Sequence, residues 1–237
     1  LQYGGAADWN IAYLPFFWDS MEHSKSFLEH PDGGGKMLAG LEAFNIKGLT
    51  MLPDSYWTVD FTKDTPLDNL ASVAGLKAAA TGGLIQTAWE VRGATPVFMY
   101  PQEALQNYET GMVDTFANSV GAAVVQKQYE GSTYGLLYSP IVAATQTCVM
   151  NLDTWDSLSS GIQSVIENMV IPELEAYAWE TVPAGEQAAI EVLKANLIVK
   201  TATLLEQQAV WQQVSAQAGD TLAYINADLI TLADSLR

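Results

Sequence analysis

The arginines are the side chains in this sequence best suited to binding a small organic acid, and the chain has only two, Arg92 and Arg237. A guanidinium group binds a carboxylate through two parallel hydrogen bonds, which provide both affinity and orientation. Bidentate recognition of an acidic ligand therefore has few candidates in this chain.

Catalytic chemistry has weaker support than ligand binding. The two histidines, His23 and His30, lie in one short segment, and His30 precedes a proline in an expected turn. The sequence contains neither a Gly-x-Ser-x-Gly elbow nor a His-Glu-x-x-His helix. Cys148 is the only cysteine and sits in the apolar run TQTCVMNL, typical of a small buried side chain. We predict that the protein is not an enzyme and holds no metal ion or cofactor.

The composition indicates a folded globular chain with a strong acidic excess. Its 237 residues are 49% hydrophobic and 16% charged, enough for one large domain or two lobes. It has 27 acidic and 10 basic residues, for a net charge of -17. This balance argues against nucleic acid and anionic membrane surfaces as partners. No apolar run is long enough to insert into a bilayer.

The clearest local pattern is the stretch 89–118, whose punctuation predicts alternating helices and strands. Gly93 ends a helix, Pro101 begins a second one and Gly111 ends that helix in turn. The segment TPVFMY between them reads as a buried strand, and a further strand is predicted over Met112–Phe116. Helices and strands in this order build a sheet covered by helices.

The ends of these strands are candidate ligand contacts, because strand ends in such sheets line ligand crevices. They carry Tyr100 and the segment Phe116–Asn118. The junction Thr81-Gly82-Gly83, between an expected strand and helix, could direct backbone N–H groups at a ligand. The aromatic residues Tyr56 and Trp57 lie in another extended stretch.

Other segments give simpler expectations. We predict a short strand over Trp9–Ala12, a helix over Leu152–Met169 and a helix that begins at Pro183. The chain is expected to close with two helices hinged near Gly219-Asp220.

Taken in order, local patterns of this chain resemble those of the substrate-binding proteins of tripartite ATP-independent periplasmic (TRAP) transporters. The matching segments are GGAADWNIA, LPFFWDSMEHSKSFLEHPDG, PLDNLASVAGLKAA, GATPVFMYPQEALQNYETGMVDTFAN and LDTWDSLSSGIQSVIENM. They follow the family's order and cover nearly the whole chain. The family's first strand–helix–strand unit is missing before them, so the chain is expected to be a fragment or a reduced member.

The resemblance implies an α/β, two-lobed periplasmic-binding-protein-like fold with crossing strands and long C-terminal helices. Lobe one would hold residues 1–56 and 142–183, and lobe two residues 57–141 and 184–237. Such a receptor is periplasmic, closes on a small organic solute and delivers it to the TRAP-type membrane permease subunits without chemistry.

The family's ligand anchors are only partly present. The family places a carboxylate-binding arginine two residues after its Gly-Leu-Lys motif, where this chain has Ala79, and a second arginine near Trp57–Val59, where no basic residue occurs. Asn118 matches a family pocket position directly. The predicted ligand-binding residues are Asn118, Phe116, Tyr100, Trp57, Tyr56, Ala79 and Thr81.

The missing arginines predict a solute that is not a simple carboxylate, such as a neutral polar or aromatic compound or a cation. One alternative is a carboxylate bridged by a metal ion, with Glu90 and Asp114 as candidate oxygen ligands. Another is a degenerate binding module that acts as a sensor or scaffold.

Overall fold

The computed structural model describes residues 7–139 and 144–237. Its strands are short except for the two that form a long ribbon. They are β1 (Ile46–Ser55), β2 (Thr58–Thr62), β3 (Lys77–Ala80), β4 (Thr95–Phe98), β5 (Phe116–Ser119), β6 (Tyr134–Tyr138), β7 (Ala144–Asn151) and β8 (Ile198–Thr201).

The α-helices range from single turns to one long helix. They are α1 (Met21–Leu28), α2 (Lys36–Ala39), α3 (Gly83–Val91), α4 (Pro101–Glu109), α5 (Val120–Val125), α6 (Leu152–Ser157), α7 (Ser160–Val165), α8 (Ile171–Asn196), α9 (Leu204–Gln217), α10 (Asp220–Ala223) and α11 (Ala227–Ser235). Further short helical turns span Ala7–Tyr13, Pro31–Gly35, Gly40–Phe44, Leu70–Val73, Gln128–Gly131 and Ile166–Val170.

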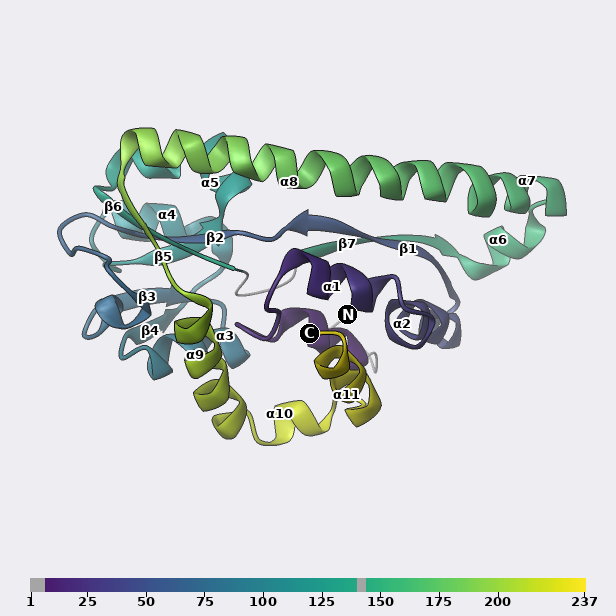
Figure 1. The fold of residues 1–237 in the computed structure, drawn as a ribbon, viewed down its shortest axis with the longest axis horizontal. Coiled ribbons are helices and arrows are strands. Elements are labelled where there is room, and N and C mark those ends of the chain that lie inside the picture. The colour runs from purple at the N-terminus through teal and green to yellow at the C-terminus, as the bar shows by residue number, and fades with distance from the viewer. Residues whose placement is uncertain (1–6, 140–143) are drawn as a thin grey trace.

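Three small sheets organise the strands. The central sheet has the order β5-β2-β6-β8, with β2 antiparallel to both of its neighbours and β6 parallel to β8. β3 and β4 form a parallel pair, and Ala78 makes a parallel bridge to Thr115 just before β5. β1 and β7 form an antiparallel ribbon that extends away from the central sheet (Figure 1).

The elements form two groups that the long helix α8 connects. β3–β6 and α3–α5 lie in one group, α1, α2 and α11 lie in the other, and α8 runs along both (Figure 1). α8 packs against β1 and also against α5. The predicted lobe boundaries, residues 1–56 with 142–183 and residues 57–141 with 184–237, remain a prediction.

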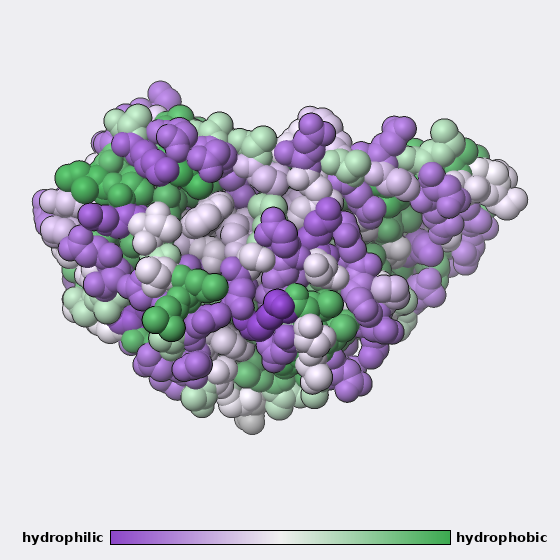
Figure 2. Space-filling view, in the orientation of Figure 1, coloured by the Kyte–Doolittle hydropathy of each residue, from purple (hydrophilic) through white to green (hydrophobic). Residues whose placement is uncertain are grey.

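Each group has its own buried core. Residues between Trp9 and Met51 pack with Ile225, Leu229 and Ala233 of the C-terminal segment. Two further clusters surround the central sheet, one with α3 and α9 and the other with α4 and the end of α8. The face shown in Figure 2 mixes hydrophilic side chains with several hydrophobic patches. Ile162 and Val165 of α7 are among the exposed hydrophobic residues.

The punctuation predicted for residues 89–118 matches the structure at both glycines and at the proline. Gly93 has φ +85° directly after α3, and its N–H donates to the carbonyl of Glu90 at 2.9 Å. Pro101 is the first residue of α4, and Gly111 has φ +78° just beyond that helix. The second strand begins later than predicted, because the Met112–Phe116 segment turns and β5 covers Phe116–Ser119.

Three other expectations were wrong in whole or in part. The helix predicted over Leu152–Met169 is divided into α6, α7 and the turn Ile166–Val170, because Leu158 has an extended backbone between α6 and α7. Trp9–Ala12 is not a strand but part of the helical turn Ala7–Tyr13, whose side chains pack into the core instead of pairing with another strand. Pro183 does not begin a helix, because it lies inside α8. Its fixed φ is compatible with a helix, and residues on both sides of it, such as Ala178 and Ala189, are buried against neighbouring elements.

The Gly93→Ala substitution is expected to destabilise the fold by about 1–3 kcal/mol, because a side chain is strained at its positive φ. The new Cβ would also lie 3.0 Å from the Cβ of Ala74. Urea unfolding of both proteins measures this difference. Gly121→Ala in α5 is the matched control, since its Cβ would meet nothing within 4 Å. That change should stabilise the fold by roughly 0.5–1 kcal/mol. A Gly93→Ala protein as stable as the unchanged chain would contradict the prediction.

Candidate ligand-binding site

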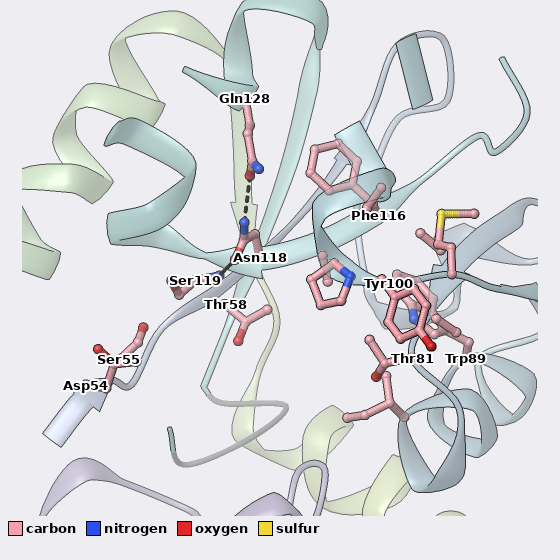
Figure 3. Close-up of a pocket in the computed structure, with 17 residues that line it drawn as sticks. Asp54, Ser55, Thr58, Thr81, Trp89, Tyr100, Phe116, Asn118, Ser119 and Gln128 are labelled. Atoms are coloured by element: carbon pink, nitrogen blue, oxygen red, sulfur yellow. Dashed lines mark hydrogen bonds between the residues drawn. The ribbon is translucent and has the colours of Figure 1, made fainter. Parts of the chain in front are cut away.

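A cavity of about 320 Å³ lies where the carboxyl ends of β3, β4 and β5 meet the end of β1. β3, β4 and the segment entering β5 run parallel to one another, so their ends open at one edge. The residues that follow each strand therefore converge on the same space. Figure 3 shows Tyr100 and Thr81 on one side of the cavity and Asp54 and Ser55 on the opposite side.

The structure brings most of the predicted site residues together in this cavity. Ala79 and Thr81 line it from the end of β3, Tyr100 from the start of α4, and Phe116 and Asn118 from β5. Tyr56 and Trp57 do not line it. They line a second cavity, which has no lining residue in common with the first.

The amide of Asn118 is held in one orientation by two hydrogen bonds. Its Nδ2 donates to Oε1 of Gln128 at 2.9 Å, and its Oδ1 accepts the N–H of Ser119 at 2.8 Å (Figure 3). Gln128 is itself buried and donates to Gln126 at 2.8 Å. An amide carries two donor hydrogens and two acceptor lone pairs, so one of each remains for a solute.

The two aromatic residues of the cavity differ in burial. Phe116 is 1% exposed and packs against Phe61 and Tyr108, with ring centroids 5.0 and 4.9 Å away. Tyr100 is 64% exposed and contacts only the ring of Phe98 among the described aromatic pairs. Phe116 is therefore part of the core that forms the cavity wall, while Tyr100 presents a ring that a solute can contact.

The described lining of the cavity carries no positive charge. Among the described residues that line it, none is lysine, arginine or histidine, and Asp54 is the only carboxylate. Thr58 occupies the wall near the place where the resemblance puts a second arginine, and Ala79 takes the place of the first. A carboxylate buried here would find no cation among the described lining residues.

Both arginines of the chain are engaged elsewhere. The guanidinium of Arg92 is fully buried, forms an ion pair with Asp60 and donates through Nε to the carbonyl of Leu70 at 2.9 Å. Arg237 lies 2.6 Å from Asp19 and 3.0 Å from Asp234. Neither arginine lines the cavity, so neither replaces the missing anchors.

The other candidate groups have structural contacts of their own. Asp114 accepts the N–H of Lys77 at 2.8 Å, and Glu90 accepts from Gln86 at 2.9 Å. Neither acid lines the cavity. Within residues 7–139 and 144–237, no group of three or more His, Cys, Asp or Glu side chains is placed to hold a metal ion.

The histidines also serve the fold. His23 is buried, and its Nε2 lies 2.8 Å from the carbonyl of Ala233 while its Nδ1 accepts the N–H of Asp19. Burial lowers the pKa of His23, although the contact with Ala233 opposes that shift. His30 accepts the N–H of Asp32 at 3.1 Å.

Several residues that line the cavity were not predicted from the sequence. Asp54 and Ser55 are the last residues of β1, so the rule for strand ends that predicted Tyr100 applies to them as well. Trp89 lies on the buried face of α3, where a core position is the ordinary interpretation. Gln128 has no local signal, because only the folded chain brings it to Asn118.

The chain matches the family described as bacterial extracellular solute-binding protein, family 7 (DctP), over residues 3–223. No curated protein matches it. Every helix in the described part of the chain is too short or too polar to span a membrane.

Solved structures of TRAP periplasmic solute-binding proteins share the fold. One from Ochrobactrum anthropi is 21% identical with a TM-score of 0.84, covering 97% of this chain and 71% of its own. One from Xanthobacter autotrophicus, with bound β-D-galacturonate, is 19% identical with a TM-score of 0.78, covering 98% and 76%. The periplasmic ectoine-binding protein of Halomonas elongata is 18% identical with a TM-score of 0.75, covering 96% and 74%.

These similarities confirm the predicted α/β, two-lobed fold. The family match, which extends over most of the chain, confirms the resemblance drawn from the sequence and the prediction that the protein is not an enzyme. The chain therefore belongs to bacterial extracellular solute-binding protein family 7.

Proposed function

We propose that this receptor binds an uncharged or cationic small organic solute in the cavity at the ends of β3, β4 and β5, and delivers it to TRAP-type permease subunits. The observation that carries the proposal is the charge of the cavity. Its described lining includes Asp54 but no cation, with Ala79 at the position of the family's arginine. An unpaired carboxylate would lose its hydration there without gaining a counter-charge.

The polar groups of the cavity suit a solute that forms neutral hydrogen bonds. The oriented amide of Asn118 offers one donor and one acceptor, and the hydroxyls of Ser55 and Thr81 lie at opposite sides (Figure 3). Tyr100 supplies an exposed ring for stacking or for contact with a cation. A volume of about 320 Å³ is at the small end of the range for ligand pockets.

The related structures support the choice of solute class by contrast. The relative from Xanthobacter autotrophicus holds galacturonate, and one from Shewanella oneidensis holds succinate, both of them carboxylates. The Halomonas elongata relative binds ectoine. Because this chain lacks the family's arginines, we expect it to prefer neither succinate nor galacturonate as its solute.

A thermal-shift screen tests this proposal. We expect uncharged or cationic compounds to raise Tm by roughly 5–10 °C at about 100 times Kd, while succinate and galacturonate leave it unchanged. Ala79→Arg puts a guanidinium at the family's position, so that variant should bind these carboxylates at least about tenfold more tightly than the unchanged chain. Strong stabilisation of the unchanged chain by succinate would contradict the proposal.

Delivery to a permease is a separate step with its own test. Genes for a pair of membrane permease subunits beside this one, and loss of uptake of the identified solute when the gene is deleted, are the expected results. Solute binding without any effect on uptake would favour a sensor or scaffold.

A further inference from the structure

A second cavity, of about 500 Å³, lies where the chain passes between the two groups of elements. Tyr56 and Trp57 join β1 to β2, Ser139 follows β6, and Glu186 lies in the middle of α8. Asp19 and Glu22, at the start of α1, complete the wall from the other group. We call this space the crossover cavity.

The crossover cavity is acidic. It is lined by the carboxylates of Asp19, Glu22 and Glu186, and by no lysine, arginine or histidine among the described residues. Asp19 already pairs with Arg237 at 2.6 Å. Glu22 is exposed and takes part in no ion pair within residues 7–139 and 144–237.

Besides burial, all three carboxylates raise the pKa of the same residue, Tyr56. Burial raises the pKa of Tyr56, a hydrogen bond with Ser139 opposes that shift, and the charges of Glu22, Asp19 and Glu186 raise it further. Negative charge is therefore concentrated around the Tyr56 ring.

Glu186 is a buried carboxylate with half of its bonding capacity unused. It is 4% exposed, and its Oε1 accepts from the hydroxyl of Ser55 and from the N–H groups of Tyr56 and Trp57 at 2.7–2.8 Å. Its Oε2 is buried and has no hydrogen-bond partner among the described residues. Buried carboxylate oxygens almost always have a donor, so this oxygen indicates a missing one.

Two aromatic rings stand beside these acids. The rings of Tyr56 and Trp57 are 5.9 Å apart and nearly perpendicular, at 88°. Perpendicular aromatic faces next to carboxylates form the type of site that recognises alkylammonium groups, because ring faces and carboxylates both attract a positive charge.

We propose that the crossover cavity is a second binding site, separate from the solute cavity, that takes a small organic cation such as an alkylammonium compound. An ammonium group supplies the donor that Oε2 of Glu186 lacks, while its alkyl part packs on Tyr56 and Trp57. A metal ion fits less well, since the described acids form no group placed to hold one. An anion fits poorly because Glu22 lies in the first turn of α1, whose N-cap Ser20 already accepts the N–H of His23 at 2.9 Å.

Calorimetric titration of the whole chain with n-butylammonium and with cadaverine, which both carry N–H donors and an alkyl part, tests this proposal. We expect saturable binding of at least one probe. Glu22→Gln and Tyr56→Leu should each weaken it about tenfold, through loss of a charge and of a ring face. Glu29→Gln is the matched control, because it removes the same charge from the other end of α1, outside the cavity, and it should leave the affinity unchanged.

The same titration distinguishes binding in the crossover cavity from binding in the solute cavity. Ala79→Arg places a positive charge there and should not change binding in the crossover cavity. Absence of saturable binding at millimolar probe would overturn the proposal. So would equal affinities for the unchanged chain and Glu22→Gln, or loss of binding on Ala79→Arg, which would assign the cation to the solute cavity. Since Glu22 is exposed, its variant tests the idea even if Tyr56→Leu does not fold.

Discussion

The substitution Arg92→Ala is expected to destabilise the protein by about 3–5 kcal/mol, as measured by urea unfolding, because it strands a buried charge. The Asp60 side chain is fully buried, and its partners are the guanidinium of Arg92 and the hydroxyl of Tyr138, which donates at 2.6 Å. The guanidinium also lies over the Trp89 ring, 4.4 Å from its centroid. Alanine removes the counter-charge, one hydrogen bond to Leu70 and this stacking contact.

Two further variants separate this mechanism from a general loss of arginine. Arg237→Ala breaks partly exposed ion pairs with Asp19 and Asp234 and a hydrogen bond to the carbonyl of Phe17, and should cost less, roughly 1 kcal/mol. The double variant Asp60→Leu, Arg92→Met removes both charges and should be more stable than Arg92→Ala, since no unpaired carboxylate remains. An Arg92→Ala cost no greater than that of Arg237→Ala would show that the buried pair does not stabilise the fold.

The fate of Arg92 also shows what local sequence can and cannot predict. Gly93, Pro101 and Gly111 were placed correctly because a helix end depends on the backbone preferences of a few adjacent residues. The role of Arg92 depends on Asp60, which is 32 positions away along the chain. No local pattern links the two residues, so this ion pair was not predicted from the sequence.

The same difference between local and long-range interactions explains which residues of the cavity were predicted from the sequence. Strand order is a tertiary property, yet the rule that residues after parallel strands converge was enough to bring Tyr100, Thr81 and Asn118 to one cavity. Tyr56 and Trp57 fall between β1 and β2, and which face of that crossing they occupy depends on how the strands pair. Gln128 orients Asn118 from a helical turn that has no sequence signature.

The prediction that separates scaffold from solute contact concerns the two aromatic residues of the cavity. Phe116→Ala should destabilise the protein by about 3–5 kcal/mol, because it removes a ring that is 1% exposed and leaves a space between Phe61 and Tyr108. Tyr100→Ala should change the free energy of unfolding by no more than about 0.5 kcal/mol, since its ring is 64% exposed. Urea unfolding of both variants measures the contrast.

The affinity for the solute found in the thermal-shift screen should depend more on Tyr100 than on Phe116, which is the reverse of their effects on stability. Tyr100→Ala removes an exposed ring from the cavity while keeping the backbone N–H that donates to Glu103 at 3.0 Å, so the fold of α4 is retained and the affinity is lost. Phe116→Leu keeps most of the apolar volume at the wall and should preserve binding in the folded protein. If Tyr100→Ala bound the solute normally while Phe116→Leu did not, the ring buried in the wall would be the solute contact. Tyr100 would then be a surface residue whose exposure has no functional consequence.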